Sequence, residues 1–182
     1  KEATALYCPV CRTSVAQAEV EDQEMAGVFY DIAFKTDDGQ ELIIATTRPE
    51  LLPACVAVFS HPDDKRYTKL AGKNITTPLG QTVQILTDDK VSIEKGTGLV
   101  MCCTYGDETD VYWIRKHKLP ERVILTKDGR FIEMNDLPEI SSKPIAEARN
   151  IIVSKLADLG AIKKEQQISH DVGVHERCGT PI

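Results

Sequence analysis

Short runs of apolar residues, broken by polar turns, make up most of the chain and predict more strands than helices. Residues 27–35 and 41–46 are rich in β-branched and aromatic side chains and flank the turn sequence TDDGQ. An Asp-Gly pair between two such runs predicts a β-hairpin. Further strands are predicted at 54–59, 82–86, 97–103 and 122–125.

Three segments carry helix signals. Residues 61–72 predict a short helix, and residues 107–119 predict a longer one that stops before Pro120. Pro144 opens the clearest helix, whose apolar residues recur at helical spacing as far as the stop at Gly160. Because these helices do not alternate with the strands in a βαβ rhythm, we predict an α+β, β-rich fold with a β-barrel-like core and peripheral helices.

The composition is that of a globular protein large enough for one sizeable core, with 182 residues. The formal charge of −6 argues against a generally basic surface that coats nucleic acid, but it leaves room for a local basic patch. No apolar run has the length of a membrane span. The chain opens with KEATALYCPVC, without an initiator Met or a leader, so we expect a cytoplasmic protein and a piece cut from a longer one.

Two short metal-binding motifs lie at opposite ends of the chain, Cys8-Pro-Val-Cys11 and His175-Glu-Arg-Cys178. Together they offer three thiolates and one imidazole, which is a complete tetrahedral set for structural zinc with no open position for catalysis. The alternative is two unrelated pairs, with His175 merely exposed. The other three cysteines are more typical of buried small hydrophobic residues: Cys55, Cys102 and Cys103.

A polar break interrupts the apolar stretch ATTRPELLPACVAV at residues 45–58. It places Thr46, Thr47 and Arg48 between two strand candidates. Such a break is either a turn in which the threonines bond local backbone groups, or the wall of a site.

A second break closes the stretch GTGLVMCCTYGDETD at residues 96–110. Asp107 and Asp110 are three apart, so they share one face if they lie on a helix. One interpretation makes Asp107 a first-turn or N-cap acid and leaves Asp110 solvated. The other is a carboxylate that points at an ammonium group, such as the α-amine of an amino acid.

ATTRPELLPACVAV, GTGLVMCCTYGDETD and VGVHERCGTPI together resemble the editing insertion of class I aminoacyl-tRNA synthetases. The motifs occur in the family's order, and the resemblance covers essentially the whole chain. TTRPE is shared by the valyl and leucyl branches, whereas the isoleucyl branch usually carries Thr-Thr-Pro-Trp there. ELLPACVAV, MCCTYGD and ERCGTPI resemble the valyl branch, especially its archaeal type.

The resemblance implies that the two polar breaks face each other across an editing pocket. Asp110 matches the family aspartate that holds the substrate's α-ammonium, and Thr46 and Thr47 would line the pocket beside it, so these three form the implied catalytic set. The implied substrate-binding residues are Arg48, which would place the terminal adenosine or its phosphate, and Glu50, Lys95, Met101, Cys103 and Asp107.

Some positions depart from the family pattern. Many bacterial valyl enzymes have Lys and Thr where Met101 and Cys103 stand, and an aromatic residue where Lys95 stands. The leucyl branch has a threonine where Leu51 stands. The group that recognises the substrate hydroxyl therefore stays open at this point.

The implied function is hydrolysis of threonyl esters on the tRNA for valine. No nucleophile–base pair is apparent, so we predict attack by a positioned water, with Asp110 fixing the ammonium and the threonines polarising the carbonyl. The HIGH and KMSKS signatures and any Gly-rich nucleotide loop are missing, so ATP would belong to the parent enzyme's synthetic site. Alternatives are leucyl or isoleucyl editing, a non-catalytic tRNA-binding insertion, and a zinc-ribbon interaction domain.

The implied organisation has three parts. Residues 1–20 would form an N-terminal zinc-knuckle strand, residues 21–168 the editing domain, and residues 169–182 a C-terminal zinc-knuckle strand. The expected partners are the tRNA for valine and the rest of the parent synthetase, with no membrane, and the isolated chain is expected to be a monomer.

Overall fold

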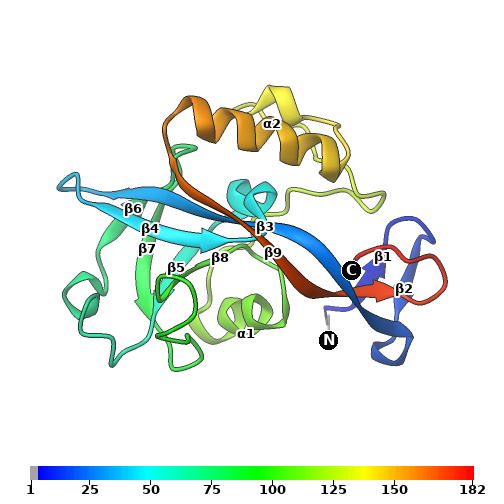
Figure 1. Cartoon of the computed structure of the whole chain (residues 1–182), viewed down its shortest axis with the longest axis horizontal. Coiled ribbons are helices and arrows are strands. Elements are labelled where there is room, and N and C mark those ends of the chain that lie inside the picture. Colours follow the sequence, from blue (N-terminus) through cyan, green and yellow to red (C-terminus); the bar gives the residue numbers. More distant parts are fainter. Residues whose placement is uncertain (1–3) are drawn as a thin grey trace.

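The computed structural model describes residues 4–182. Its centre is one seven-stranded sheet with the order β4-β3-β6-β7-β5-β8, in which β9 also pairs with β3. β4 and β8, at the two ends of this path, contact each other, so the sheet curls into a half-barrel (Figure 1). The strands are β3 (Val20–Thr36), β4 (Glu41–Thr46), β5 (Ala57–Ser60), β6 (Asn74–Thr76), β7 (Thr82–Thr87), β8 (Leu99–Cys102) and β9 (Ile162–His175).

The predicted hairpin is confirmed by the antiparallel pairing of β3 and β4, which runs from Tyr30 opposite Thr46 to Lys35 opposite Glu41. Alternate residues of a strand point to the same face of the sheet. Ile32 is accordingly buried in the barrel interior, as are Phe34 and Ile44. β5 pairs in parallel with β7 and antiparallel with β8, so the sheet is mixed.

Two α-helices flank the half-barrel, and both are confirmed predictions. α2 (Ile145–Asp158) packs its buried residues Ala148, Ile152 and Leu156 against the 3-10 helix η2 (Pro49–Ala54). α1 (Glu108–His117) buries Trp113, which stacks on Phe59 of β5 with ring centroids 4.3 Å apart. The two helices lie on opposite sides of the sheet in Figure 1.

Two predicted elements are wrong. Residues 61–72 form turns and one 3-10 helix, η3 (Thr68–Leu70), instead of an α-helix. The Asp64 side chain accepts hydrogen bonds from the Arg66 amide and guanidinium, and this local bonding competes with a helix. Residues 122–125 make only an isolated bridge from Leu125 to Phe131 rather than a strand. The predicted strand at 54–59 begins only at Ala57, because η2 extends to Ala54.

The long strand β9 carries no clear sequence signal and was not predicted. It pairs with the first part of β3 from Val20 opposite His175 to Ile32 opposite Ile162, and its residues 163–167 are all exposed. Figure 1 shows this ribbon leading away from the half-barrel to a small hairpin, β1 (Leu6–Cys8) and β2 (Thr13–Val15). β3 begins at the boundary expected at residue 20, and β9 continues past the one expected at residue 168.

Candidate active site and metal cluster

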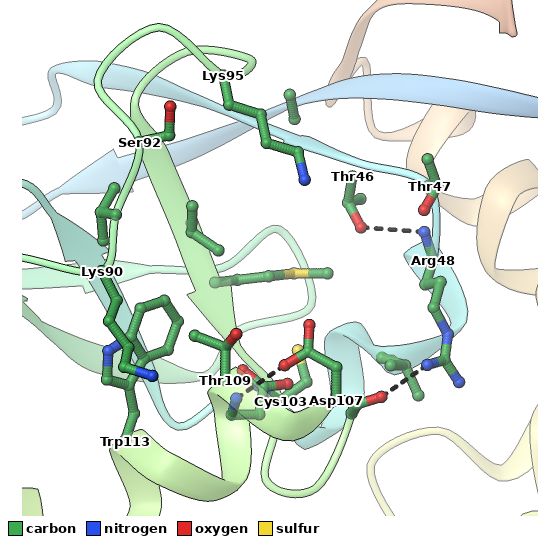
Figure 2. Close-up of a pocket in the computed structure, with 17 residues that line it drawn as sticks. Thr46, Thr47, Arg48, Lys90, Ser92, Lys95, Cys103, Asp107, Thr109 and Trp113 are labelled. Carbon is green, nitrogen blue, oxygen red and sulfur yellow. Dashed lines mark hydrogen bonds between the residues drawn. The ribbon is translucent and has the colours of Figure 1, made fainter. Parts of the chain in front are cut away.

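A cavity of about 400 Å³ opens between the end of β4, the loop before β8 and the start of α1 (Figure 2). The polar breaks at residues 45–58 and 96–110 meet across it, as the resemblance implied. The lining residues are Ala45, Thr46, Thr47, Arg48, Leu51, Lys90, Val91, Ser92, Lys95, Val100, Met101, Cys103, Gly106, Asp107, Thr109, Asp110 and Trp113.

The wall after β4 is held in place from two directions. The hydroxyl of Thr46 accepts a hydrogen bond from the Arg48 amide at 3.0 Å, which is the local turn that the sequence left open as an alternative. The guanidinium of Arg48 donates to the Gly106 carbonyl at 2.8 Å and so ties this wall to the turn before α1. Arg149 of α2 donates to the Thr47 carbonyl at 2.8 Å. Both threonines therefore line the cavity on a fixed backbone.

Glu50 lies beside the cavity rather than in its lining. Its side chain is buried and forms a salt bridge to Arg149 at 2.7 Å and a longer one to Arg48 at 3.7 Å. A buried carboxylate between two guanidiniums is a satisfied structural group. It fixes the position of Arg48 and leaves the cavity to other side chains.

The Gly-Thr-Gly turn shapes the opposite rim. Both glycines have positive φ, 60° at Gly96 and 80° at Gly98. A Cβ on Gly96 would lie 3.1 Å from the Ala45 side chain, and one on Gly98 would lie 2.5 Å from the Arg66 guanidinium. Glycines therefore let the loop pack against β4 at Gly96 and against the Arg66–Asp64 pair at Gly98. This packing projects Lys95, whose amine points into the cavity in Figure 2.

Asp107 and Asp110 differ in role although they stand in the same helical turn. Asp107 is the N-cap of α1 and accepts a hydrogen bond from the Asp110 amide at 2.8 Å, as the N-cap interpretation predicted. The expectation that goes with it, a solvated Asp110, is wrong, because Asp110 is only 6% exposed. Its carboxylate accepts a hydrogen bond from the Cys103 amide at 3.2 Å.

The electrostatics of Asp110 are those of a buried acid without a cation. Burial raises the pKa of Asp110 to about 7, the nearby charge of Asp107 adds to the shift, and the hydrogen bond from the Cys103 amide opposes it. Among residues 4–182, no lysine, arginine or histidine forms a salt bridge with it. A ligand that brings a positive charge would satisfy this carboxylate.

A strained turn brings these groups together. Thr104 has φ 52°, which is rare for a residue with a branched side chain, and it is buried. Its hydroxyl lies 3.2 Å from the carbonyls of Ala54 and Arg122 and accepts from the Arg122 amide at 3.0 Å. Gly106 follows, where a Cβ would come within 2.5 Å of the Asp110 carboxylate. The turn therefore needs both residues to seat Asp110.

The lining residues that sequence reasoning missed include Thr109, Trp113, Lys90 and Ser92. Thr109 is two residues from Asp107 and one from Asp110, so the helix-face argument would not have found it. Trp113 lies three residues beyond Asp110, so the same argument could have found it. Lys90 and Ser92 come from a loop that has no motif. Figure 2 shows the Thr109 hydroxyl on the floor of the cavity and Lys90 beside Trp113. Met101 and Cys103 form the apolar back wall and are almost completely buried.

The two terminal motifs meet at the far end of the β3–β9 ribbon. The ligand atoms of Cys8, Cys11, His175 and Cys178 all lie within 4.8 Å of one another. The Cys8 and Cys178 sulfurs are 3.6 Å apart, and the Cys178 sulfur is 3.4 Å from Nδ1 of His175. Three sulfurs and one imidazole at this spacing can hold a metal ion. His175 is buried at 1% exposure, so the alternative of a merely exposed histidine is wrong.

Known proteins resemble the chain in sequence and in fold. Valine–tRNA ligase of Rickettsia conorii (strain ATCC VR-613 / Malish 7) is 49% identical over 178 residues, which cover 97% of this chain and 22% of that protein. The same enzyme of Ehrlichia canis (strain Jake) is 47% identical over 178 residues, 94% of this chain and 22% of that protein. The chain thus spans about a fifth of the length of these relatives. No family model matches it.

Among solved structures, the fold is similar to part of a leucyl-tRNA synthetase from Agrobacterium radiobacter K84, in a ternary complex described as agnB2 LeuRS-tRNA-LeuAMS. The TM-score is 0.55 at 17% identity, over 82% of this chain and 20% of that one. The predicted α+β, β-rich fold with a barrel-like core is therefore confirmed. Its sequence matches segments of valine–tRNA ligases, which confirms the resemblance to the valyl branch.

Among residues 4–182, neither α-helix has the length and apolar character that crossing a bilayer requires.

Proposed function

We propose that the chain hydrolyses the ester bond of tRNA for valine that has been mischarged with threonine. The observation that carries this proposal is Asp110, a buried carboxylate with no cationic partner in the described chain, in the lining of a cavity rich in hydroxyl groups. An aminoacyl ester brings an ammonium group of the required charge. The identity to valine–tRNA ligases supports valine tRNA as the carrier.

Threonine is a credible substrate because valine and threonine are nearly isosteric. This pair is the standard example of discrimination that an apolar synthetic pocket cannot supply, and a second hydrolytic site is the standard remedy. A polar cavity selects in the opposite sense, because valine would leave its hydrogen-bonding groups unpaired. Thr46, Thr109 and the amine of Lys95 border the cavity and are the candidate partners of the threonine hydroxyl.

In the mechanism we propose, a water molecule attacks the ester carbonyl. Asp110 holds the α-ammonium, and the hydroxyls of Thr46 and Thr47 polarise the carbonyl. Arg48 is fixed by Gly106 and Glu50 at the rim, where its guanidinium can meet the phosphate of the terminal nucleotide. Met101 and Cys103 close the back wall and exclude bulk water.

We further propose that zinc occupies the cluster of Cys8, Cys11, His175 and Cys178. A closed set of three thiolates and one imidazole suits structural zinc and leaves no position for a substrate. Its role would be to fix the β1–β2 hairpin to the end of the ribbon. The parent synthetase and the tRNA are the proposed partners, in the cytoplasm, and ATP is reserved for the parent's synthetic site. Metal analysis of the purified chain tests the zinc assignment, with one equivalent expected.

The deciding experiment measures deacylation of valine tRNA esterified with threonine, valine or isoleucine, by the purified chain and by Asp110→Ala. We expect hydrolysis of the threonyl ester alone, lost in the variant. Hydrolysis that survives in Asp110→Ala would remove Asp110 from the mechanism. If the chain instead hydrolyses leucyl or isoleucyl esters on their own tRNAs, its function would be leucyl or isoleucyl editing. If the chain hydrolyses no ester, the assay is repeated in the full-length synthetase, where continued inactivity would favour a non-catalytic insertion.

A further inference from the structure

A second, smaller cavity of about 180 Å³ adjoins the candidate active site. The two share Arg48, Leu51, Cys103 and Gly106, and the hydrogen bond from Arg48 to the Gly106 carbonyl lies at their boundary. A ligand in the first cavity can therefore continue into the second without leaving the surface. The remaining lining residues of the second cavity are Ala54, Thr104, Tyr105, Arg122, Val123, Ile124 and Leu125.

The lining of the second cavity is unusual for a protein surface. Val123 is 59% exposed and Tyr105 is 42% exposed, so an apolar side chain and an aromatic ring face solvent together. Leu51 and Ile124 form the buried floor behind them. Exposed apolar patches bordered by polar groups mark binding sites. A flat, apolar ligand of modest size fits such a surface.

The charge beside this patch is positive and available. Arg122 is exposed, and among the interactions found for residues 4–182 its guanidinium has neither a hydrogen bond nor a salt bridge. Most arginines of the chain differ from it, because Arg66 and Arg177, for example, are each paired with a carboxylate. An unpaired guanidinium at the edge of an apolar hollow is suited to a ligand that joins a flat ring to an anion.

The turn at Thr104 contributes lining residues to both cavities. Its hydroxyl bonds the backbone of Arg122 in both directions, which fixes the residue 122 backbone against the turn that carries Tyr105 and Gly106. Arg122 is thus held by its backbone, and its side chain is not needed for these contacts. This makes the side chain removable without loss of the fold.

From this geometry we infer a nucleotide subsite, which rests on the proposed function and extends it. The cavity formed by Tyr105, Val123 and Ile124 takes the base of the nucleotide that precedes the terminal adenosine of the tRNA, and Arg122 pairs with the phosphodiester that joins the two. Unpaired RNA bases commonly rest on aromatic rings and apolar surfaces, and guanidinium groups suit phosphate. The subsite would draw the 3′ end across Arg48 and aim the ester at Asp110.

The test compares two small substrates in the purified chain: 3′-threonyl adenosine and 3′-threonyl cytidylyl-adenosine. Only the second can fill the subsite. We expect the extra nucleotide to raise kcat/KM by about tenfold, mainly through KM. In Arg122→Ala this gain should fall below about threefold, while hydrolysis of threonyl adenosine stays at the wild-type rate. Lys127→Ala is the matched control, because Lys127 is an exposed cation of the same segment outside both cavities and should keep the full gain.

Several results would overturn the subsite. One is an equal kcat/KM for both substrates in the wild-type chain, and another is a full gain in Arg122→Ala. A variant that slows both substrates equally would give Arg122 a structural role instead. If the chain hydrolyses neither ester, the proposed function fails first, and NMR titration with unesterified cytidylyl-adenosine then decides. Shifts at Val123 and Ile124 that adenosine alone does not produce support the subsite, and their absence refutes it.

Discussion

Two buried aspartates near helix α1 differ in whether a cationic side chain pairs with them. Asp110, in its first turn, is 6% exposed and has no salt bridge within residues 4–182. Asp88, which faces its last turn, is 3% exposed but lies 2.7 Å from the amine of Lys116 and 3.1 Å from His117. Burial disfavours ionisation of Asp88, yet the hydrogen bonds from Lys116, the Lys90 amide and His117 outweigh it and hold the pKa of this carboxyl below its usual range.

The difference separates a structural acid from a functional one. Helix α1 supplies the positive charge that pairs with Asp88, so this carboxylate stabilises the fold and needs no ligand to neutralise it. It leaves Asp110 with only neutral donors, and the pKa of Asp110 rises to about 7 through burial and the charge of Asp107. A titratable group in a cavity whose pKa is strongly shifted is a candidate functional residue. We expect variants at the two positions to differ in what they damage.

The largest effect is expected on hydrolysis. Asp110→Asn keeps the shape of the side chain but removes the negative charge, so threonyl-tRNA hydrolysis should fall about a hundredfold or more because the ammonium is no longer held. Asp88→Asn should stay within about threefold of the wild-type rate when assayed below its melting temperature, since Asp88 does not line the cavity. Equal losses in both variants would show that Asp110, too, acts through the fold.

The second prediction concerns pH. Below about pH 7, Asp110 is protonated in the free chain and cannot pair with an ammonium group. The kcat/KM for threonyl-tRNA should therefore rise about tenfold per pH unit toward 7 and decline again near pH 8, where the substrate's α-ammonium loses its proton. The measurement is a pH profile between 5 and 8, corrected for spontaneous hydrolysis of the ester. Asp88→Asn should show the same profile, and a wild-type profile that is flat across this range would contradict the role of Asp110.

The third prediction is that the two substitutions change stability with opposite signs at pH 8. The folded pKa of Asp110 is raised above its unfolded value of about 4, so the wild-type chain loses stability as pH rises from about 4 to 7. Asp110→Asn removes this loss and should be more stable than wild type at pH 8 by on the order of 2 kcal/mol, with little difference near pH 4.

Asp88 has the opposite sign, because its folded pKa is lowered. Its contribution is present above the unfolded pKa of about 4 and is lost only in more acidic solution. Asp88→Asn should therefore destabilise the chain at pH 8 by about 2 kcal/mol, as hydrogen bonds to a charged partner are lost. Urea unfolding of the wild-type chain and both variants, at pH 4 and at pH 8, measures these differences in stability. Destabilisation of the same size by both variants at pH 8 would refute the distinction.

The contrast between the aspartates also marks how far the sequence could be interpreted. The polar breaks at residues 45–58 and 96–110 each left a local role and a site as alternatives, and only the resemblance to the editing insertion implied that they face each other. The strands and the helix from Ile145 to Asp158 followed from periodicity. By contrast, the burial of Asp110 depends on Gly106 and on packing across the cavity, and periodicity carries no information on either.

The failures have similar physical causes. Residues 163–167 of β9 are all polar and exposed, so this part of the strand lacks the alternation of apolar and polar residues that could reveal it. The segment 61–72 has helix-like spacing, but the bonds from Arg66 to the Asp64 carboxylate favour a turn. The partner of Asp88 lies 28 residues away along the chain. Pairings of that kind are decided by tertiary structure, and no local pattern distinguishes the paired aspartate from the unpaired one.

The smallest predicted effect concerns the turn that seats Asp110. Thr104→Ala removes a buried hydroxyl that bonds the backbone of Ala54 and Arg122, and should cost about 1 kcal/mol of stability. Hydrolysis should fall severalfold, since the Cys103 amide that orients Asp110 immediately precedes this residue. Thr104→Ser keeps the hydroxyl and should restore most of both. Unfolding curves and kcat/KM measured on the three chains test this, and a Ser variant no better than Ala would show that the methyl group, rather than the hydrogen bonds, holds the turn.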